Sequence, residues 1–306
     1  MKKNFLICGL GNIGYRHAQS IVNNIHVKRI YIYDKDIISY DKFLSKFNTF
    51  QKKKFFILKK LYKKDLNFFL VIIATNSTGR YNILDQILKS FRVEHVLLEK
   101  FLEDRIKNLK LLKKKFYNKK IFVNYTWRYF SASKIIKKNI RKNNDFLIRF
   151  EGKSWNMASN ALHIVDMIKY IFNANVNNIE LKKNTKLINS KRKGFKEVLG
   201  TIVFNLSNKI KISLNSFDKN IKKRLIISHQ TKKIIYEIDD NTLLLKNKKI
   251  KKVEMTPVSK STNLILSYLL KKKYEKLPKL DECIDDSILY LSQINQRFKK
   301  TNIKIT

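Results

Sequence analysis

The sequence predicts an α/β protein with two domains: an N-terminal doubly wound parallel sheet, then an α+β domain with an open, mainly antiparallel sheet. Three observations lead to this prediction. The chain has 306 residues, enough for two cores, and 44% of them are hydrophobic. Up to residue 125, short apolar runs alternate with longer amphipathic ones, as in repeated βαβ units. Beyond it, strand-like runs follow one another, which is typical of an antiparallel sheet.

The first domain is predicted to span residues 1–125. Its strand segments are short and almost entirely apolar, as expected for parallel strands buried on both faces. The amphipathic segments between them are the predicted helices. The predicted strands are 4–8, 29–33, 69–74, 95–98 and 121–125, and the predicted helices are 13–23, 40–47, 79–90 and 103–117.

The second domain is predicted to span residues 126–306. Its helical patterns come first and last, and its strand-like runs lie between them. The predicted helices are 132–141, 160–172, 262–272 and 284–298, and the predicted strands are 178–181, 200–206, 209–214, 224–229, 233–238 and 242–245.

The chain is strongly basic, with 66 Lys and Arg residues against 24 Asp and Glu residues and a formal net charge of +42. The lysines are spread along the whole sequence, together with only 7 Gly and 2 Pro, a composition typical of AT-rich coding bias. We therefore interpret the charge as a solvated basic surface that favours anionic ligands, and we expect no nucleic-acid partner. A nucleic-acid binder would instead lose affinity steeply with salt.

The lengths of the apolar segments and the number of cysteines indicate where the protein is located and whether it binds a metal. No segment approaches the roughly 18 uninterrupted apolar residues of a membrane span. The two cysteines, Cys8 and Cys283, have neither a disulfide framework nor metal-ligand spacing. We expect a soluble cytoplasmic protein with no membrane partner and no metal site.

A glycine-rich turn follows the first predicted strand. Gly9, Gly11 and Gly14 fit the pattern G-x-G-x-x-G directly before an amphipathic helix. The first glycine permits a tight turn, the second lets the backbone approach a pyrophosphate, and the third lets the helix approach the strand. Asn12 and Ile13 open the helix, whose unpaired N–H groups bind phosphate oxygens. The pattern predicts a Rossmann dinucleotide-binding site.

The next predicted strand ends in an acidic residue, Asp34, which lies 20 residues after Gly14. At this separation a carboxylate accepts hydrogen bonds from the adenosine ribose, and it repels a 2′-phosphate. We therefore expect NAD rather than NADP, although the adjacent Lys35 softens this preference.

Four motifs, taken in order, resemble the Gfo/Idh/MocA family of NAD(P)-dependent sugar and inositol oxidoreductases over essentially the whole chain. They are GYRHAQS at 14–20, VIIATNSTGRY at 71–81, LLEKFL at 97–102 and NALHIVDMIKYIF at 160–172. The stretch SWNMASNALHIVDM is similar to a branch associated with surface-polysaccharide loci.

Polar residues follow the third predicted strand, at the carboxyl edge where such sheets bind ligands. Ala74, Thr75, Asn76 and Tyr81 are expected to border the nicotinamide half of the cofactor. Ser77 or Thr78 could at the same time cap the following helix.

The resemblance implies a catalytic pair. Glu99 and Lys100 resemble the family's Glu-Lys-Pro, with Phe101 in place of proline, and Glu99 is expected to border the cofactor. Lys100 would hold the substrate oxygen and lower the pKa of a nearby histidine. His163 would take the proton of the substrate hydroxyl while hydride leaves the same carbon.

A second departure from the family pattern, after Phe101, concerns the proposed catalytic histidine. Many members carry aspartate four residues before the histidine, where this chain has Ser159. Three explanations stay open: Asp166 orients His163, the Lys and His pair acts without the aspartate, or the catalytic assignment is wrong.

The resemblance also implies substrate contacts. Arg128 matches an arginine that often follows the sixth strand, and it could clamp a carboxylate or phosphate. Trp155, Asn156 and Asn160 would line the sugar site, together with His163 and Lys100.

The expected activity is hydride transfer between NAD and a sugar, sugar nucleotide or related polyol. The alternative is a non-catalytic protein that binds a dinucleotide or sugar nucleotide. Because the open face of the second sheet must be buried, we expect a homodimer or homotetramer.

Overall fold

The computed structural model describes residues 2–62, 65–140, 145–229, 232–245, 248–250, 253, 257–300 and 303–305. The chain divides into two compact units: residues 1–124 with 257–284, and residues 125–256 with 285–306. The first unit therefore includes a segment from late in the sequence, which a single boundary at residue 125 does not anticipate.

The first unit contains a six-stranded sheet in the order β3-β2-β1-β4-β5-β6, and every strand pair in it is parallel. The doubly wound parallel sheet is thus confirmed. The order reverses beside β1, which places a topological switch point at the carboxyl ends of β1 and β4. The strands are β1 (Lys3–Cys8), β2 (Val27–Tyr33), β3 (Phe55–Ile57), β4 (Asn67–Ile73), β5 (Arg92–Leu98) and β6 (Ile121–Val123).

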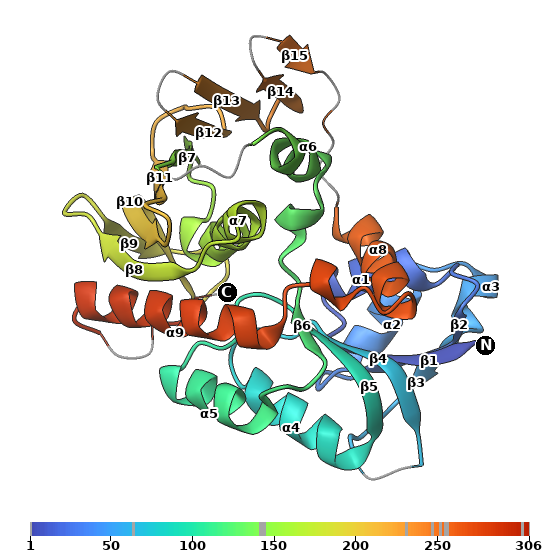
Figure 1. Ribbon diagram of the computed structural model, residues 1–306. Helices are drawn as coiled ribbons and strands as arrows, with labels where there is room; N and C mark the ends of the chain where they lie inside the picture. The colour runs from blue at the N-terminus through green and yellow to red at the C-terminus, as the bar shows by residue number, and fades with distance from the viewer. Residues whose placement is uncertain are drawn as a thin grey trace. The chain divides into compact units, whose positions relative to one another are not determined.

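Helices cover both faces of this sheet (Figure 1), with α4 and α5 side by side on one face and α1 with α8 on the other. The backbone N–H of Asn263 donates to the Ser20 hydroxyl at 2.9 Å, which ties α8 to α1. The helices are α1 (Asn12–Ile21), α2 (Ile38–Leu44), α3 (Thr49–Lys52), α4 (Arg80–Ser90), α5 (Ile106–Phe116), α8 (Val258–Leu270) and the short 3-10 helix η2 (Tyr274–Lys276).

The second unit is built on a nine-stranded sheet, counted over the described residues. Its order is β15-β14-β13-β12-β7-β11-β10-β8, and β9 pairs with β10. Among the strand pairs that the structure describes here, β7–β11 alone is parallel, so the sheet is mainly antiparallel, as predicted. The strands are β7 (Leu147–Lys153), β8 (Val176–Leu181), β9 (Lys186–Asn189), β10 (Lys196–Leu206), β11 (Lys211–Phe217), β12 (Arg224–His229), β13 (Lys232–Glu237), β14 (Thr242–Leu245) and β15 (Lys248–Ile250).

The inner face of this sheet is apolar. Phe150 of β7 is paired with Leu214 of β11 and Leu225 of β12, and all three side chains are buried. The ring of Tyr290 in α9 lies 5.7 Å from that of Phe204 in β10, so α9 packs on this face. The helices of the unit are η1 (Thr126–Tyr129), α6 (Ser131–Asn139), α7 (Met157–Phe172) and α9 (Leu280–Arg297), the last of which crosses the boundary between the units.

The outer face is mixed. Glu151 of β7 accepts from Arg149 at 3.1 Å and from Arg224 at 2.5 Å. Beside this charged cluster, the register aligns Ile226, Ile235 and Leu244 in one apolar row.

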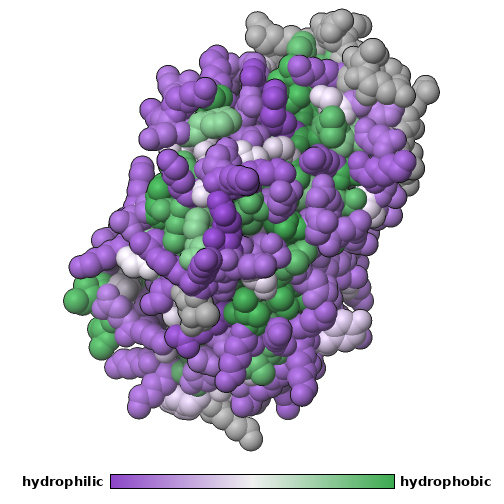
Figure 2. All heavy atoms as spheres, turned by 90° about the vertical axis from the view of Figure 1, so that its left-hand side faces the viewer, coloured by the Kyte–Doolittle hydropathy of each residue, from purple (hydrophilic) through white to green (hydrophobic). Residues whose placement is uncertain are grey.

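Hydrophilic side chains cover most of the face drawn in Figure 2, and hydrophobic residues form separate areas between them. In the part of the chain that the structure describes, no helix combines the length and apolarity needed to cross a membrane.

Candidate active site

Two glycines bring the first turn close to its neighbours. Gly9 has a φ of +93°, and a Cβ built on it would lie 2.7 Å from the backbone of Ala74 and Thr75. A Cβ on Gly14 would lie 1.8 Å from the carbonyl oxygen of Gly9. Only glycine fits at these two positions, so the loop after β1 can pack against both the end of β4 and its own helix.

The middle glycine faces open space instead. A Cβ on Gly11 would meet nothing within 4 Å, and Gly11 is the N-cap of α1. Among the described residues no side chain caps this helix, and its first turn contains no acidic residue. The first N–H groups of α1, from Asn12 and Ile13 onward, are therefore oriented for an anion, which fits the pyrophosphate of a dinucleotide.

The Asp34 carboxylate is fixed beside this turn. Its Oδ2 accepts the backbone N–H of Leu10 at 2.7 Å, and its Oδ1 accepts that of Asp36 at 3.1 Å. The Tyr40 hydroxyl accepts the backbone N–H of Asp34 at 2.9 Å and holds the end of β2. Each carboxylate oxygen keeps a second lone pair, so Asp34 can still accept from ribose hydroxyls.

A buried arginine holds the loop that contains Ala74, Thr75 and Asn76. The guanidinium of Arg80, 1% exposed, donates to the carbonyls of Thr75, Glu99 and Phe101, and so joins the ends of β4 and β5. The sequence suggested no such role for it, because the accepting carbonyls lie on separate loops.

Another carboxylate caps α4. Glu103 accepts the backbone N–H groups of Gly79 at 3.0 Å and Tyr81 at 2.9 Å. The cap expected from Ser77 or Thr78 is therefore supplied from a distant loop, and the Thr78 hydroxyl donates to Asp104 at 2.5 Å. With Glu103 used in this way, α5 begins at Ile106 instead of residue 103.

Glu99 is turned into the core. Its Oε1 lies 2.9 Å from Nε2 of His17 and also accepts from the Asn124 amide. Burial opposes ionisation, but the hydrogen bond and charge of His17, the Asn124 amide and the Lys100 charge together lower the pKa of Glu99 to about 2. Lys100, next in the chain, is half-buried and precedes a cis peptide bond to Phe101.

His163 lies on α7 in the second unit, 6% exposed, with its ring 5.4 Å from that of Tyr125. Ser159 lies one turn earlier on the same face of the helix. The Ser159 hydroxyl donates to Oε1 of Glu197 at 2.6 Å, and the N–H of Ala158 donates to Oε2 at 2.8 Å. A buried carboxylate from β10 thus lies at the position where the sequence lacked one.

Asp166 is paired with Arg128. Nε and Nη2 of Arg128 donate to the two carboxylate oxygens of Asp166, Nε at 2.8 Å. Burial raises the pKa of Asp166, and the Arg128 charge opposes that rise. Two nitrogens of Arg128, the residue expected to clamp the substrate, are therefore used within the protein. Both oxygens of Asp166, which was considered as a partner for His163, accept from Arg128.

Trp155 and Asn160 support the start of α7. Trp155 is 6% exposed, packs edge-on against Phe150 and donates from Nε1 to the carbonyl of Asn215 at 2.9 Å. The Asn160 amide donates to the carbonyl of Trp155 at 3.0 Å. These contacts give both residues a structural role, and their expected role in sugar binding stays a prediction.

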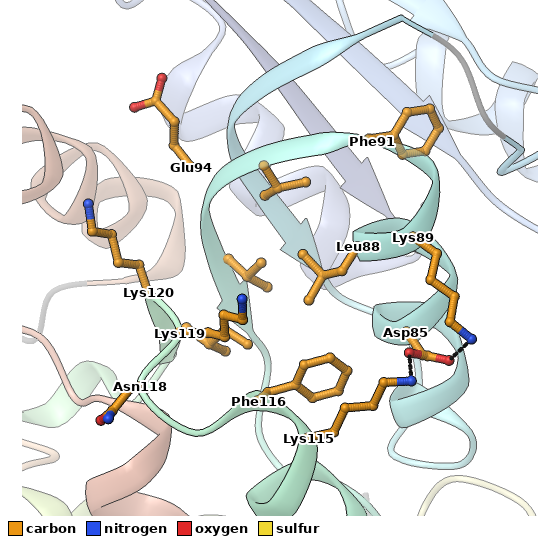
Figure 3. Close-up of a pocket in the computed structure, with 13 residues that line it drawn as sticks. Asp85, Leu88, Lys89, Phe91, Glu94, Lys115, Phe116, Asn118, Lys119 and Lys120 are labelled. Atoms are coloured by element: carbon orange, nitrogen blue, oxygen red, sulfur yellow. Dashed lines mark ion pairs between the residues drawn. The ribbon is translucent and has the colours of Figure 1, made fainter.

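A separate pocket of about 510 Å³ lies in the first unit (Figure 3). It is lined by residues of α4, the start of β5, the end of α5 and the loop before β6. Asp85 lies between Lys89, at 2.9 Å, and Lys115. Because these are the amino ends of the strands, the pocket is at the opposite edge of the sheet from the glycine turn.

The parallel sheet, the glycine turn and the carboxylate after β2 are the features of a Rossmann dinucleotide-binding domain. Residues 3–125 match the Gfo/Idh/MocA family, described as an oxidoreductase family with an NAD-binding Rossmann fold. This match covers the Rossmann domain and ends at residue 125 of the 306 residues. No curated protein matches it in sequence.

Solved structures share the fold over nearly the whole chain. UDP-N-acetylglucosamine 3-dehydrogenase from Acidithiobacillus ferrooxidans has a TM-score of 0.69 at 11% identity, covering 100% of this chain and 98% of its own. Scyllo-inositol dehydrogenase from Lactobacillus casei, solved with NAD(H) and scyllo-inositol, has a TM-score of 0.68 at 12% identity, covering 98% and 97%. Biliverdin reductase from Synechocystis, solved with biliverdin and NADP+, has a TM-score of 0.69 at 15% identity, covering 97% and 98%.

Proposed function

We propose that the protein is an NAD-dependent dehydrogenase or reductase that acts on a CH–OH group of a sugar, sugar nucleotide or related polyol. The observation that carries this proposal is the turn after β1, where Gly11 leaves open space at the uncapped end of α1. Asp34 is fixed beside that turn by the N–H of Leu10, in position to accept ribose hydroxyls.

Each residue has a distinct task in the proposed reaction. The first turn of α1 holds the pyrophosphate, and the loop 74–76 borders the nicotinamide. When bound, NAD accepts or supplies the hydride. The Lys100 ammonium holds the reacting oxygen of the substrate, and His163 takes up or returns its proton.

The proposed substrate class is supported by two solved structures with the same fold, one of a UDP-N-acetylglucosamine 3-dehydrogenase and one of a scyllo-inositol dehydrogenase. Biliverdin reductase has the same fold and a different substrate, so the fold alone does not select a sugar. The basic surface favours an anionic substrate, which makes a nucleotide-linked or acidic sugar the preferred candidate within the class.

The same proposal includes assembly and location. The row of Ile226, Ile235 and Leu244 on the outer face of the second sheet supports a homodimer or homotetramer joined there. Light scattering on the purified protein measures this state. The two cysteines, Cys8 and Cys283, are buried free thiols, which supports a reducing compartment such as the cytoplasm.

The test combines binding with turnover. NADH binding is followed by fluorescence, and oxidation is followed at 340 nm with a panel of keto-sugars and sugar nucleotides. We expect Lys100→Ala to lower kcat about 100-fold or more while NADH affinity changes little. Lys110→Ala, an exposed lysine of α5, is the matched control and should behave as wild type.

Asp34→Asn tests cofactor choice. The amide oxygen can still accept from Leu10, so only the charge is lost, and we expect weaker NAD binding with reduced discrimination against NADP. Tight NADH binding without oxidation of any candidate would favour the non-catalytic alternative. Failure to bind either nicotinamide nucleotide would refute both.

A further inference from the structure

A chain of buried hydrogen bonds links four elements of the first unit around His17. From α1, the His17 ring reaches Thr262 of α8 through Nδ1 at 2.8 Å and Glu99 at the end of β5 through Nε2 at 2.9 Å. Asn124, after β6, donates to the same oxygen of Glu99. His17 and Thr262 are fully buried, and Glu99 is 6% exposed. The resemblance assigned no role to His17, Asn124 or Thr262.

The hydrogens of this chain can be assigned from its partners. The Thr262 hydroxyl donates its one hydrogen to the carbonyl of Val258 at 3.1 Å, so its oxygen accepts from Nδ1–H of His17. An ionised carboxylate has no hydrogen to give, so Glu99 accepts from Nε2–H as well as from Asn124. With the Thr262 hydrogen on Val258, both ring nitrogens of His17 face acceptors, which is the hydrogen-bond arrangement that suits an imidazolium.

We propose that His17 is a positioning residue for the reaction proposed above: a buried imidazolium that neutralises the Glu99 carboxylate and fixes the loop that carries Lys100 to the helix of the glycine turn. This inference rests on the proposed function only in its use of Lys100. The ion pair itself is a property of the folded first unit.

The charge of His17 matters because Glu99 and Lys100 are adjacent in the chain. A buried carboxylate without a partner attracts a neighbouring cation, and the charge of Lys100 already acts on Glu99. With His17 and Asn124 on its Oε1, Glu99 is already compensated. Lys100 can then direct its ammonium to a substrate oxygen.

The first experiment measures the His17 ring directly. In protein labelled with ¹⁵N-histidine, we expect wild-type His17 to show both ring nitrogens protonated at pH 7, and Glu99→Gln to show only one. His95 is an internal contrast, since burial lowers its pKa and its ring should carry a single N–H. A single N–H on wild-type His17 would overturn the proposal whatever the enzyme does.

The second experiment separates charge from packing. His17→Gln keeps an amide donor for Glu99 but leaves its charge without a counter-ion, so we expect kcat to fall about 10- to 100-fold with little change in the KM for NAD. His17→Gln combined with Glu99→Gln removes both charges and should recover most of the loss. A double variant as slow as the single one would show that His17 acts by packing alone.

The matched control is His95→Gln. His95 is a second buried histidine of the same sheet, and its ring lies 3.0 Å from the carbonyl of Phe69 and 3.1 Å from the Tyr274 hydroxyl. It should change stability and leave kcat unaltered. If wild-type protein binds no nicotinamide nucleotide, the proposed function and the role given to Lys100 fail together, while the ring measurement still decides on the ion pair.

Discussion

At the scale of single residues, Glu197 changes how Ser159 is interpreted. Its carboxylate comes from β10, is 4% exposed, and accepts from Ser159 and Ala158 at the first turn of α7. The positive end of the helix stabilises an anion there. An acidic charge therefore lies one turn from His163 although residue 159 carries none.

We expect Glu197→Gln to move the acid limb of the pH–rate profile for substrate oxidation to lower pH. An anion favours protonated His163, so its removal makes the histidine easier to deprotonate and the active base form persists to lower pH. Tyr125 packs against the His163 ring, Arg128 and Asp166 pair with each other, and the Tyr290 hydroxyl donates to the carbonyl of Met157; the substitution replaces none of these groups.

Ser159→Asp in the Glu197→Gln background is the matched reversal. It returns a carboxylate to the same turn from a different residue, and the profile should move back toward wild type. If Glu197→Gln leaves the profile in place and lowers only the unfolding temperature, Glu197 is a helix cap and nothing more.

Site residues could be predicted from the sequence where a motif of nearby residues marks them. They could not be predicted where the fold brings together segments that are distant in the sequence. Gly9 and Gly14 make the close backbone approaches that their spacing predicts, and Asp34 lies beside the same turn. Arg80 and Glu197 act on groups brought to them by other loops and strands, which no spacing in one sequence reveals. Buried charged residues can be recognised only once the fold is known.

At the scale of elements, two glycines in the turn between β1 and α1 have different roles: Gly14 is needed for folding and Gly11 for cofactor binding. Gly14→Ala would put a methyl group 1.8 Å from the carbonyl oxygen of Gly9, whereas Gly11→Ala would meet no protein atom within 4 Å. We therefore expect Gly14→Ala to destabilise the protein by several kcal/mol, as overpacking does. Gly11→Ala should leave the unfolding temperature close to that of wild type.

Although Gly11→Ala should not destabilise the protein, it should weaken cofactor binding. Its methyl group occupies the space where the pyrophosphate must approach the backbone, so we expect NADH affinity to fall by tenfold or more. Thermal unfolding and NADH titration on the same preparations make the comparison. Normal NADH affinity in Gly11→Ala would show that the cofactor does not bind at this turn.

Strands could be predicted from the sequence where the side chains on both of their faces are buried. β4, NFFLVII, is buried on both faces, and its apolar run stands out. β7, LIRFEGK, was missed because its outer face carries Arg149, Glu151 and Lys153, which interrupt the apolar signal. β3 and β15 have three residues each, too few to show a period.

At the scale of the whole molecule, a few buried charges make stability depend on pH in opposite directions. Glu99, with its pKa lowered to about 2, adds stability above the ordinary pKa of 4.5, and this is lost as the pH falls through 2. Asp286 of α9 is the contrary case. Burial, with Asp166 and Asp285, raises its pKa from 3.8 to about 6 against the opposing charge of Lys169.

The raised pKa of Asp286 makes the folded protein less stable as the pH rises. Between pH 4 and pH 6 the unfolded chain has lost the Asp286 proton while the folded protein keeps it, so stability falls as the pH rises. Two pKa units correspond to roughly 3 kcal/mol. Urea unfolding between pH 4.5 and 6.5 measures this slope, to which Asp166 and Glu103, with raised pKa values, and His95, with a lowered pKa, also contribute. The difference in slope between wild type and Asp286→Asn isolates Asp286, and the variant should lose less stability as the pH rises.

The pH dependence of the free energy of unfolding is a better measure of the Asp286 pKa than the stability at a single pH. The reason is that Asp286→Asn also leaves Lys169, 2.5 Å away in the wild type, without its counter-ion. Asp240→Asn is the matched control: Asp240 pairs with Lys222 at 3.0 Å, and both side chains are exposed, so the slope should not change. The general repulsion expected at a net charge of +42 acts almost equally on all three proteins and cancels in the comparison. An unchanged slope in Asp286→Asn would mean that Asp286 is already ionised in the folded protein at pH 4.5, with Lys169 outweighing burial.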